Sequence, residues 1–250
     1  MSYIGMVFRI DSADSLRSPW LEILVALLLF VSTLTVIGRP GVSSYVLVTH
    51  YLGTLRLISI LYMAMLAGSL ASALENGYAA TLLQVPFPRR IVAGGLLLSR
   101  VLAPLLILGG ASAAGFAALF WDMLGIITGP AFTNYLFTMI ELIGYGALFQ
   151  LLALATRSSS RTVLLSLLAY LSIGMGGEAL VFMGLALSSR TAVMLGLLGN
   201  PAEAAGIYFG YVEPGVISGS DALISLAIGV SCIAGILVFM PFYLERWFEA

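Results

Sequence analysis

The chain contains no lysine, and it has only one cysteine, Cys232, and one histidine, His50. A single thiol cannot form an internal disulfide, and one cysteine with one histidine cannot complete a Cys/His zinc site. A phosphate-binding P-loop requires the lysine that reaches the terminal phosphates of a nucleotide. These absences exclude an internal disulfide, a Cys/His zinc centre and a P-loop from this sequence, and we expect no metal site and no catalytic residues.

Charged residues are also scarce. They make up 9% of the 250 residues, whereas a soluble domain is about a quarter charged. The net charge of -1 leaves no basic surface for phosphates, so nucleic acid is not an expected partner. In contrast, 60% of the residues are hydrophobic and the mean hydropathy is +1.07. A soluble core of this size could not bury so much apolar surface, which indicates an integral membrane protein.

The apolar residues form continuous runs, which favour transmembrane helices over a β-barrel because barrel strands alternate in polarity. Each run approaches the bilayer-spanning length of about 20 residues. The runs cover residues 20–38, 57–74, 93–120, 135–155, 163–187 and 221–243. We therefore expect an all-α integral membrane fold with six transmembrane helices, in which residues 1–250 form a single transmembrane domain.

The arginines indicate the orientation of the chain in the membrane. With a cytoplasmic N-terminus, the inner side carries Arg9, Arg17, Arg89, Arg90, Arg157, Arg161 and Arg246, and the outer side carries Arg39, Arg56 and Arg190. This excess of inner arginines is typical of cytoplasmic loops. We expect a multi-pass protein of the cell membrane with both termini in the cytoplasm. Arg100 falls inside the third span near its inner end, from which its long side chain is expected to snorkel to the headgroups.

Two segments outside the spans are also predicted to be helical. Residues 1–19 mix apolar and charged residues, which is typical of an interfacial amphipathic helix. Between spans five and six, residues 188–220 contain Asn200, Pro201 and Glu203. These residues are the N-cap, first position and first-turn acid of a well-formed helix start. That helix is too short to cross a bilayer, so we expect it to be interfacial or re-entrant on the outer side.

The connection between spans two and three, residues 75–92, holds the most informative motif. It contains Glu75, Gly77, Leu82 with Leu83, Pro86 and Arg89. Gly77 can end the preceding helix, and the prolines after Val85 stop a short helix before the third span. The spacing of these residues resembles the coupling-helix loop of ABC type-2 transporter permeases. Gly95 also matches that family, whereas Ala80 and Leu96 stand where it usually has an acidic residue and a lysine.

The resemblance implies a function and a set of partners. It implies the permease subunit of an ATP-driven exporter of a hydrophobic or amphipathic substrate, which is not an enzyme by itself. The partners would be two cytoplasmic ABC ATPase subunits, a second permease copy or homologue, and membrane lipids. No cofactor would bind this chain, and ATP and Mg would bind the ATPase subunit. The residues that couple to the ATPase would be Glu75, Gly77, Thr81, Leu82, Leu83, Pro86, Arg89 and Arg90.

Two glutamates lie within the predicted spans, Glu141 in span four and Glu178 in span five. A charge at membrane depth costs at least about 2.5 kcal/mol, so each requires a partner or a function. Arg56, at the outer start of span two, could approach either of them, and a polar cluster that gates the outer exit is one hypothesis. A structural ion pair is the alternative. Gly174, Gly176 and Gly177 in span five permit either close helix packing or a break in the helix, and we expect close packing at a dimer seam.

Other function classes remain open at this point. An ion-coupled secondary transporter could use Glu141 and Glu178, although such proteins often contain inverted repeats and the sequence shows none. A membrane scaffold without transport activity would need neither the buried glutamates nor the coupling loop. An ATPase gene beside the gene for this chain would favour the ABC transporter.

Overall fold

The computed structural model describes residues 3–16, 18–37, 44–77, 88–119, 124–209 and 215–247. Within these ranges the chain forms helices and short connections, without a β-strand, which confirms the predicted all-α class. The first half contains α1 (Tyr3–Leu16), α2 (Pro19–Ile37), α3 (Ser44–Glu75), α5 (Arg89–Leu97), η1 (Leu98–Leu102) and α6 (Ala103–Leu119). The second half contains α7 (Leu124–Thr156), α8 (Ser159–Tyr170), η3 (Leu171–Met175), α9 (Gly176–Ala186), α10 (Arg190–Leu198), α11 (Pro201–Tyr208) and α12 (Gly219–Trp247).

Five helical stretches in the described part of the chain are long and apolar enough to cross a membrane. They are Tyr51–Glu75, Arg90–Gly115, Phe132–Thr156, Ser159–Ala186 and Gly219–Tyr243. They correspond to predicted spans two to six, which agrees with a membrane-embedded protein. The predicted first span, residues 20–38, corresponds to α2, whose apolar part Pro19–Val31 is shorter than the other five.

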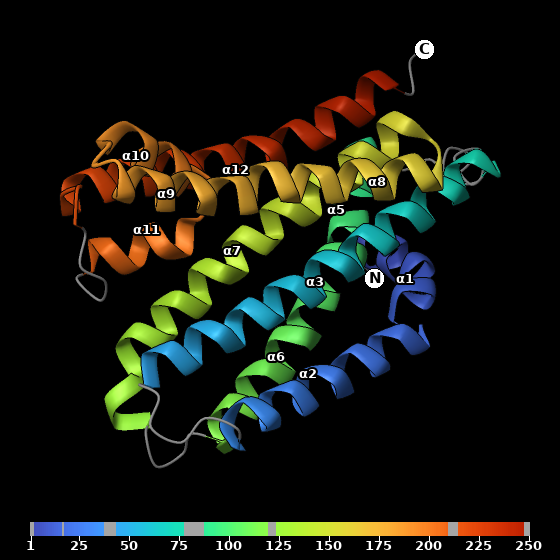
Figure 1. Cartoon of the computed structure of the whole chain (residues 1–250). Coiled ribbons are helices and arrows are strands. Elements are labelled where there is room, and N and C mark those ends of the chain that lie inside the picture. Colours follow the sequence, from blue (N-terminus) through green and yellow to red (C-terminus); the bar gives the residue numbers. More distant parts are fainter. Residues whose placement is uncertain are drawn as a thin grey trace.

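The long helices form two groups that meet along α7 (Figure 1). One group contains α2, α3 and α6, and α3 packs along both α7 and α8. In the other group, α8, η3 and α9 join into one long helix (Figure 1), and α12 packs against α5, α7, α10 and α11. The short helices α10 and α11 pack against α9, α12 and α7. They lie at the end of the molecule opposite α1 and the C-terminus (Figure 1).

The third predicted span is one helix with a widened turn in its middle. At η1, the Ala103 N–H donates to the carbonyl of Leu98, five residues earlier, whereas an α-helical N–H donates to the carbonyl four residues earlier. Pro104 follows directly and has no N–H to donate to the carbonyl of Arg100, so the regular ladder cannot continue through this turn. The widened turn places Ser99 and Arg100 in the protein interior.

Arg100 forms a buried ion pair with Asp11 of α1, so the prediction that it snorkels to the headgroups is wrong. Its Nη2 lies 2.7 Å from Asp11 Oδ1, and the two side chains are 2% and 1% exposed. Arg100 Nη1 donates to the carbonyl oxygen of Leu66 at 3.0 Å and to Ser69 Oγ at 2.8 Å. Ser99 also donates to Asp11. Because the guanidinium is neutralised inside the protein, it has no need to reach the headgroups.

The helix predicted for the N-terminal segment is present as α1, and it packs against α5 and η1. Gly95 makes this packing possible, since a Cβ atom at that position would collide with the Val7 side chain. The glycine that matches the permease motif therefore has a packing role of its own. Together, Gly95 and the Asp11–Arg100 pair attach α1 to the third predicted span.

Gly174 and Gly177 pack inside the chain, which corrects the expectation that they lie at a dimer seam. A Cβ atom at Gly177 would lie 2.8 Å from the carbonyl oxygen of Gly196 in α10. One at Gly196 would lie 2.5 Å from the carbonyl oxygen of Gly177. A Cβ atom at Gly174 would lie 2.8 Å from the Tyr170 ring. Gly177 and Gly196 therefore allow α10 to fold back closely onto α9, and no second copy is needed to explain the close packing at Gly174 and Gly177.

Replacing Gly196 by valine is expected to destabilise the protein by about 1–3 kcal/mol, because the new side chain would collide with the α9 backbone. The matched control is Gly110→Ala in α6, where a Cβ atom would meet nothing within 4 Å. The control should be neutral or slightly stabilising, because alanine favours a helix more than glycine does. Denaturant titration in detergent micelles measures both changes. Equal stability of the two variants would contradict the close α9–α10 contact.

Candidate functional site

Arg56 connects two carboxylates from two other helices. Its Nη2 lies 3.1 Å from Glu141 Oε2 on α7, and its Nη1 lies 2.9 Å from Glu178 Oε1 on α9. The Arg56 side chain is 15% exposed, that of Glu141 2% and that of Glu178 52%. The sequence predicted an approach to either glutamate, and the structure brings Arg56 to both at once. The role of this cluster as an outer gate stays a prediction.

The sequence suggested that Arg56 lies at the outer start of its helix, but the structure places it further along that helix. The helix α3 begins at Ser44, so Arg56 lies about 18 Å along it at 1.5 Å per residue. It also falls within the apolar stretch Tyr51–Glu75. The predicted span began after Arg56 because a charged residue normally ends an apolar run. Two opposite charges compensate it here, so α3 continues past it.

The helix α11 brings a third carboxylate close to the cluster. Glu203 lies within electrostatic range of Glu178 and Arg56. Burial raises the pKa of the Glu203 carboxyl, and the nearby charge of Glu178 raises it further. From the sequence, Glu203 was expected only as a first-turn residue, because nothing in its spacing relates it to helices α3, α7 and α9. Three carboxylates therefore surround one guanidinium.

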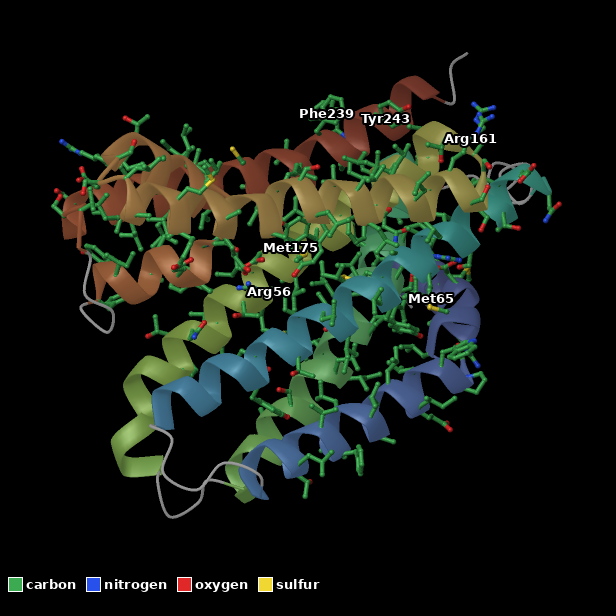
Figure 2. All side chains as sticks on the ribbon, viewed as in Figure 1. Arg56, Met65, Arg161, Met175, Phe239 and Tyr243 are labelled. Carbon is green, nitrogen blue, oxygen red and sulfur yellow. The ribbon has the colours of Figure 1, made fainter. Side chains whose placement is uncertain are left out.

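Two tyrosines lie beside the ion pairs, and no pattern in the sequence indicated them. Tyr145 of α7 and Tyr170 of α8 meet edge to face, with ring centroids 5.3 Å apart. Both are more than nine-tenths buried, and both interact electrostatically with Arg56. The site is thus a charged cluster enclosed by aromatic rings. In Figure 2, Arg56 and Met175 lie in the middle of the molecule, where the two helix groups meet.

The start of α11 follows the prediction only in part. Pro201 is the first residue of α11 and Glu203 is in its first turn. Asn200 precedes them, but its side chain caps no N–H of α11. Its Nδ2 donates instead to the carbonyl oxygen of Gly174 at 3.3 Å. Asn200 is buried, and this contact attaches the α10–α11 turn to η3.

Part of the predicted coupling loop lies outside the described residues. These are Thr81, Leu82, Leu83 and Pro86, together with the side chain of Arg89. On one side of them, α3 ends at Glu75, and Gly77 has a φ of +86°, a conformation that suits glycine at a helix end. On the other side, α5 begins at Arg89. The Arg90 guanidinium lies 5.6 Å from the ring centre of Phe242, near the end of α12.

Exposed arginines gather at the end of the molecule where α3 ends and α5 begins. Arg90 lies at the start of α5, and Arg157 and Arg161 lie at the turn between α7 and α8. All three are exposed, as is Arg9 on α1. Arg161 marks this end in Figure 2, far from α10 and α11. Such a basic end is typical of the cytoplasmic side of a membrane protein.

The described residues hold no group of three or more histidine, cysteine, aspartate or glutamate side chains that could bind a metal ion. The candidate site consists of the Arg56 ion pairs, the two neighbouring tyrosines and the nearby Glu203. No family model and no curated protein sequence matches the chain.

Proposed function

We propose that the chain is the membrane-spanning permease subunit of an ATP-driven transporter of the ABC-2 type, with export of a hydrophobic or amphipathic substrate. The observation that carries the proposal is where α3 ends and α5 begins. Both the end of α3 and the start of α5 lie at the end of the molecule where exposed arginines gather (Figure 1). In the sequence, the motif that resembles a coupling helix stands between these two helix ends. This end of the molecule is the one expected to face the cytoplasm.

In this proposal α2 is the first of six spans, and both termini lie in the cytoplasm of a cell-membrane protein. The helix α1 lies at the inner interface, and α10 and α11 lie on the outer side. A second permease copy and two ATPase subunits complete the transporter. ATP and Mg bind the ATPase, since this sequence has no lysine with which to build a P-loop.

An ion-coupled secondary transporter is the second candidate, and the buried Arg56–Glu141 pair favours it. Intramembrane carboxylates often carry protons or ions in such proteins. The two candidates differ in their energy source. ATP-dependent transport that persists when the proton and sodium gradients are collapsed supports the ABC transporter, and transport that needs a gradient but no ATP supports the alternative.

The pairing with an ATPase is tested by copurification. The chain is co-expressed with an ABC ATPase encoded beside it and purified through a tag on the permease. We expect the wild type to retain the ATPase. The triple variant Leu82→Ala, Leu83→Ala, Arg89→Ala should retain at least about tenfold less ATPase, since a few central residues dominate an interface.

A matched triple variant provides the control for this experiment. Arg161→Ala, Leu164→Ala and Leu165→Ala remove the same residue types from α8, at the same end of the molecule, where all three side chains are exposed. This variant should retain the ATPase. If the wild type retains no ATPase, or if both triple variants lose it equally, the proposed coupling loop is wrong.

A further inference from the structure

A cavity of about 130 Å³ lies beside the Arg56 cluster. It is lined by α7, η3, the turn between α10 and α11, and α12. Most of its lining is apolar, with Leu148, Ile173, Ile233 and Ile236 among the lining residues. Two polar side chains, Glu141 and Tyr145, also line it. An apolar pocket with a few polar groups is the usual form of a small-molecule site.

Both polar groups have an unused hydrogen-bonding atom. Glu141 is 2% exposed and Tyr145 6%. Arg56 occupies Oε2 of Glu141, whereas Oε1 of Glu141 and the hydroxyl of Tyr145 have no hydrogen-bond partner among the described residues. A buried carboxylate oxygen without a donor leaves the cost of its desolvation uncompensated. A ligand that donates a hydrogen bond to it would recover this cost.

The charges near the cavity favour a cation over an anion. Glu141, Glu178 and Glu203 are three carboxylates around one guanidinium, that of Arg56. An additional positive charge would reduce this excess of negative charge, and an anion would increase it. A hard metal ion is disfavoured, because it needs several oxygen ligands and the cavity offers one carboxylate and one phenol. An ammonium group can use both, and a tyrosine ring also attracts cations.

The cavity also has an apolar mouth. Its lining includes Cys232 of α12 and Ile173 of η3, and both side chains are exposed at the protein surface. An alkyl chain attached to a bound ammonium group could therefore leave the cavity without contacting the ion pairs. The volume fits a head group, since a whole drug-sized ligand needs about 300 Å³ or more.

We propose that this cavity binds the ammonium end of an amphipathic amine, with Glu141 Oε1 as acceptor and the alkyl chain passing out between Ile173 and Cys232. Recognition of such an amine as the transported substrate rests on the proposed function, whereas its binding does not. Binding is therefore measured on the full chain without any ATPase, so that the site and the ATPase pairing can fail separately.

The probe is decylammonium that carries a photoreactive diazirine next to the amine. The chain is placed in phosphatidylcholine nanodiscs and irradiated, and the labelled peptides are identified by mass spectrometry. We expect labelling of the α12 segment from Gly229 to Ile236, and excess unlabelled decylammonium should suppress it. Decanol with the same diazirine should label this segment at least about tenfold less, because a charged hydrogen bond is worth about 1.5–3 kcal/mol.

Three variants separate recognition from folding. Glu141→Gln removes the charge and should weaken binding about tenfold to a hundredfold. Ile236→Trp fills the cavity without changing any charge and should abolish the labelling of α12. Glu22→Gln removes an exposed carboxylate on α2 and should bind as the wild type does. Equal labelling by decanol, unchanged binding in Glu141→Gln, or no competed labelling in the folded wild type would each overturn the proposed amine site.

Discussion

Replacing Asp11 by alanine is expected to lower the free energy of unfolding by about 3–5 kcal/mol, because it leaves the buried Arg100 guanidinium without its counter-charge. In the wild type, Arg100 Nη2 lies 2.7 Å from Asp11 Oδ1. Its remaining hydrogen bonds, to the carbonyl oxygen of Leu66 and to Ser69, cannot neutralise the charge. Titration with sodium dodecyl sulfate in mixed micelles, followed by tryptophan fluorescence, measures the change.

Glu22→Ala is the control for the Asp11 prediction, because it removes an exposed carboxylate and should change stability little. The double variant Asp11→Leu, Arg100→Leu should recover much of the loss, since it removes both buried charges together. A loss below about 1 kcal/mol for Asp11→Ala, within the range of an exposed ion pair, would show that the pair does not hold α1 against the third predicted span.

Replacing Arg56 by methionine is the second change with a large expected effect. Glu141 would then be buried at 2% exposure without a positive charge, which is expected to cost about 3–5 kcal/mol. Glu178 should suffer less, because its side chain is 52% exposed and water can solvate it. The same detergent titration measures the stability, and a transport assay in proteoliposomes measures the activity, which should be lost.

A double variant separates the charge of Arg56 from its size. Arg56→Met combined with Glu141→Gln leaves no uncompensated buried charge, so it should recover most of the stability. Arg190→Met is the matched control, because it removes an arginine whose side chain is 66% exposed in its pair with Asp221. Its effect should be much smaller. If Arg56→Met is no more destabilising than Arg190→Met, the Arg56 cluster is not a buried electrostatic centre.

The apolar runs predicted most of the helices, because a bilayer fixes the length of a crossing helix. The predicted fourth span, 135–155, lies within α7, and the predicted fifth span, 163–187, ends one residue after the continuous α8–η3–α9 helix. Hydropathy could not place the ends of helices that continue past a compensated charge. This is why α3 extends beyond Arg56, although the predicted span began after it.

Arg100 and Arg56 show where reasoning from the sequence fails and where it succeeds. The cost of a buried charge depends on what opposes it, and the partner can lie far away along the chain. Asp11 precedes Arg100 by 89 residues, and in the sequence it reads as part of a surface helix. Arg56 was paired with the correct glutamates because the few charges within the spans left little choice. Glu203 was not linked to them, since only the fold of α10 and α11 brings it near.

The sequence predicted close backbone contacts at Gly174, Gly177 and Asn200, but not the partners of these contacts. The sequence indicated close packing at Gly174 and Gly177, and the packing exists within the chain, against Tyr170 and Tyr145 for Gly174 and against Gly196 of α10 for Gly177. Asn200 was expected to cap α11 and instead donates to Gly174. For Gly177 and Asn200 the residue type predicts a close backbone contact, whereas the partner depends on how α10 folds back onto α9.

The most direct test of the proposed permease function is crosslinking from the coupling loop. A photoreactive amino acid replaces Leu83 in the complex with the ATPase, and a second complex carries it at Leu195, an exposed residue of α10 at the opposite end of the molecule. We expect a crosslink to the ATPase from position 83 and none from position 195. A crosslink from position 195 alone, or none from position 83 in an intact complex, would contradict it.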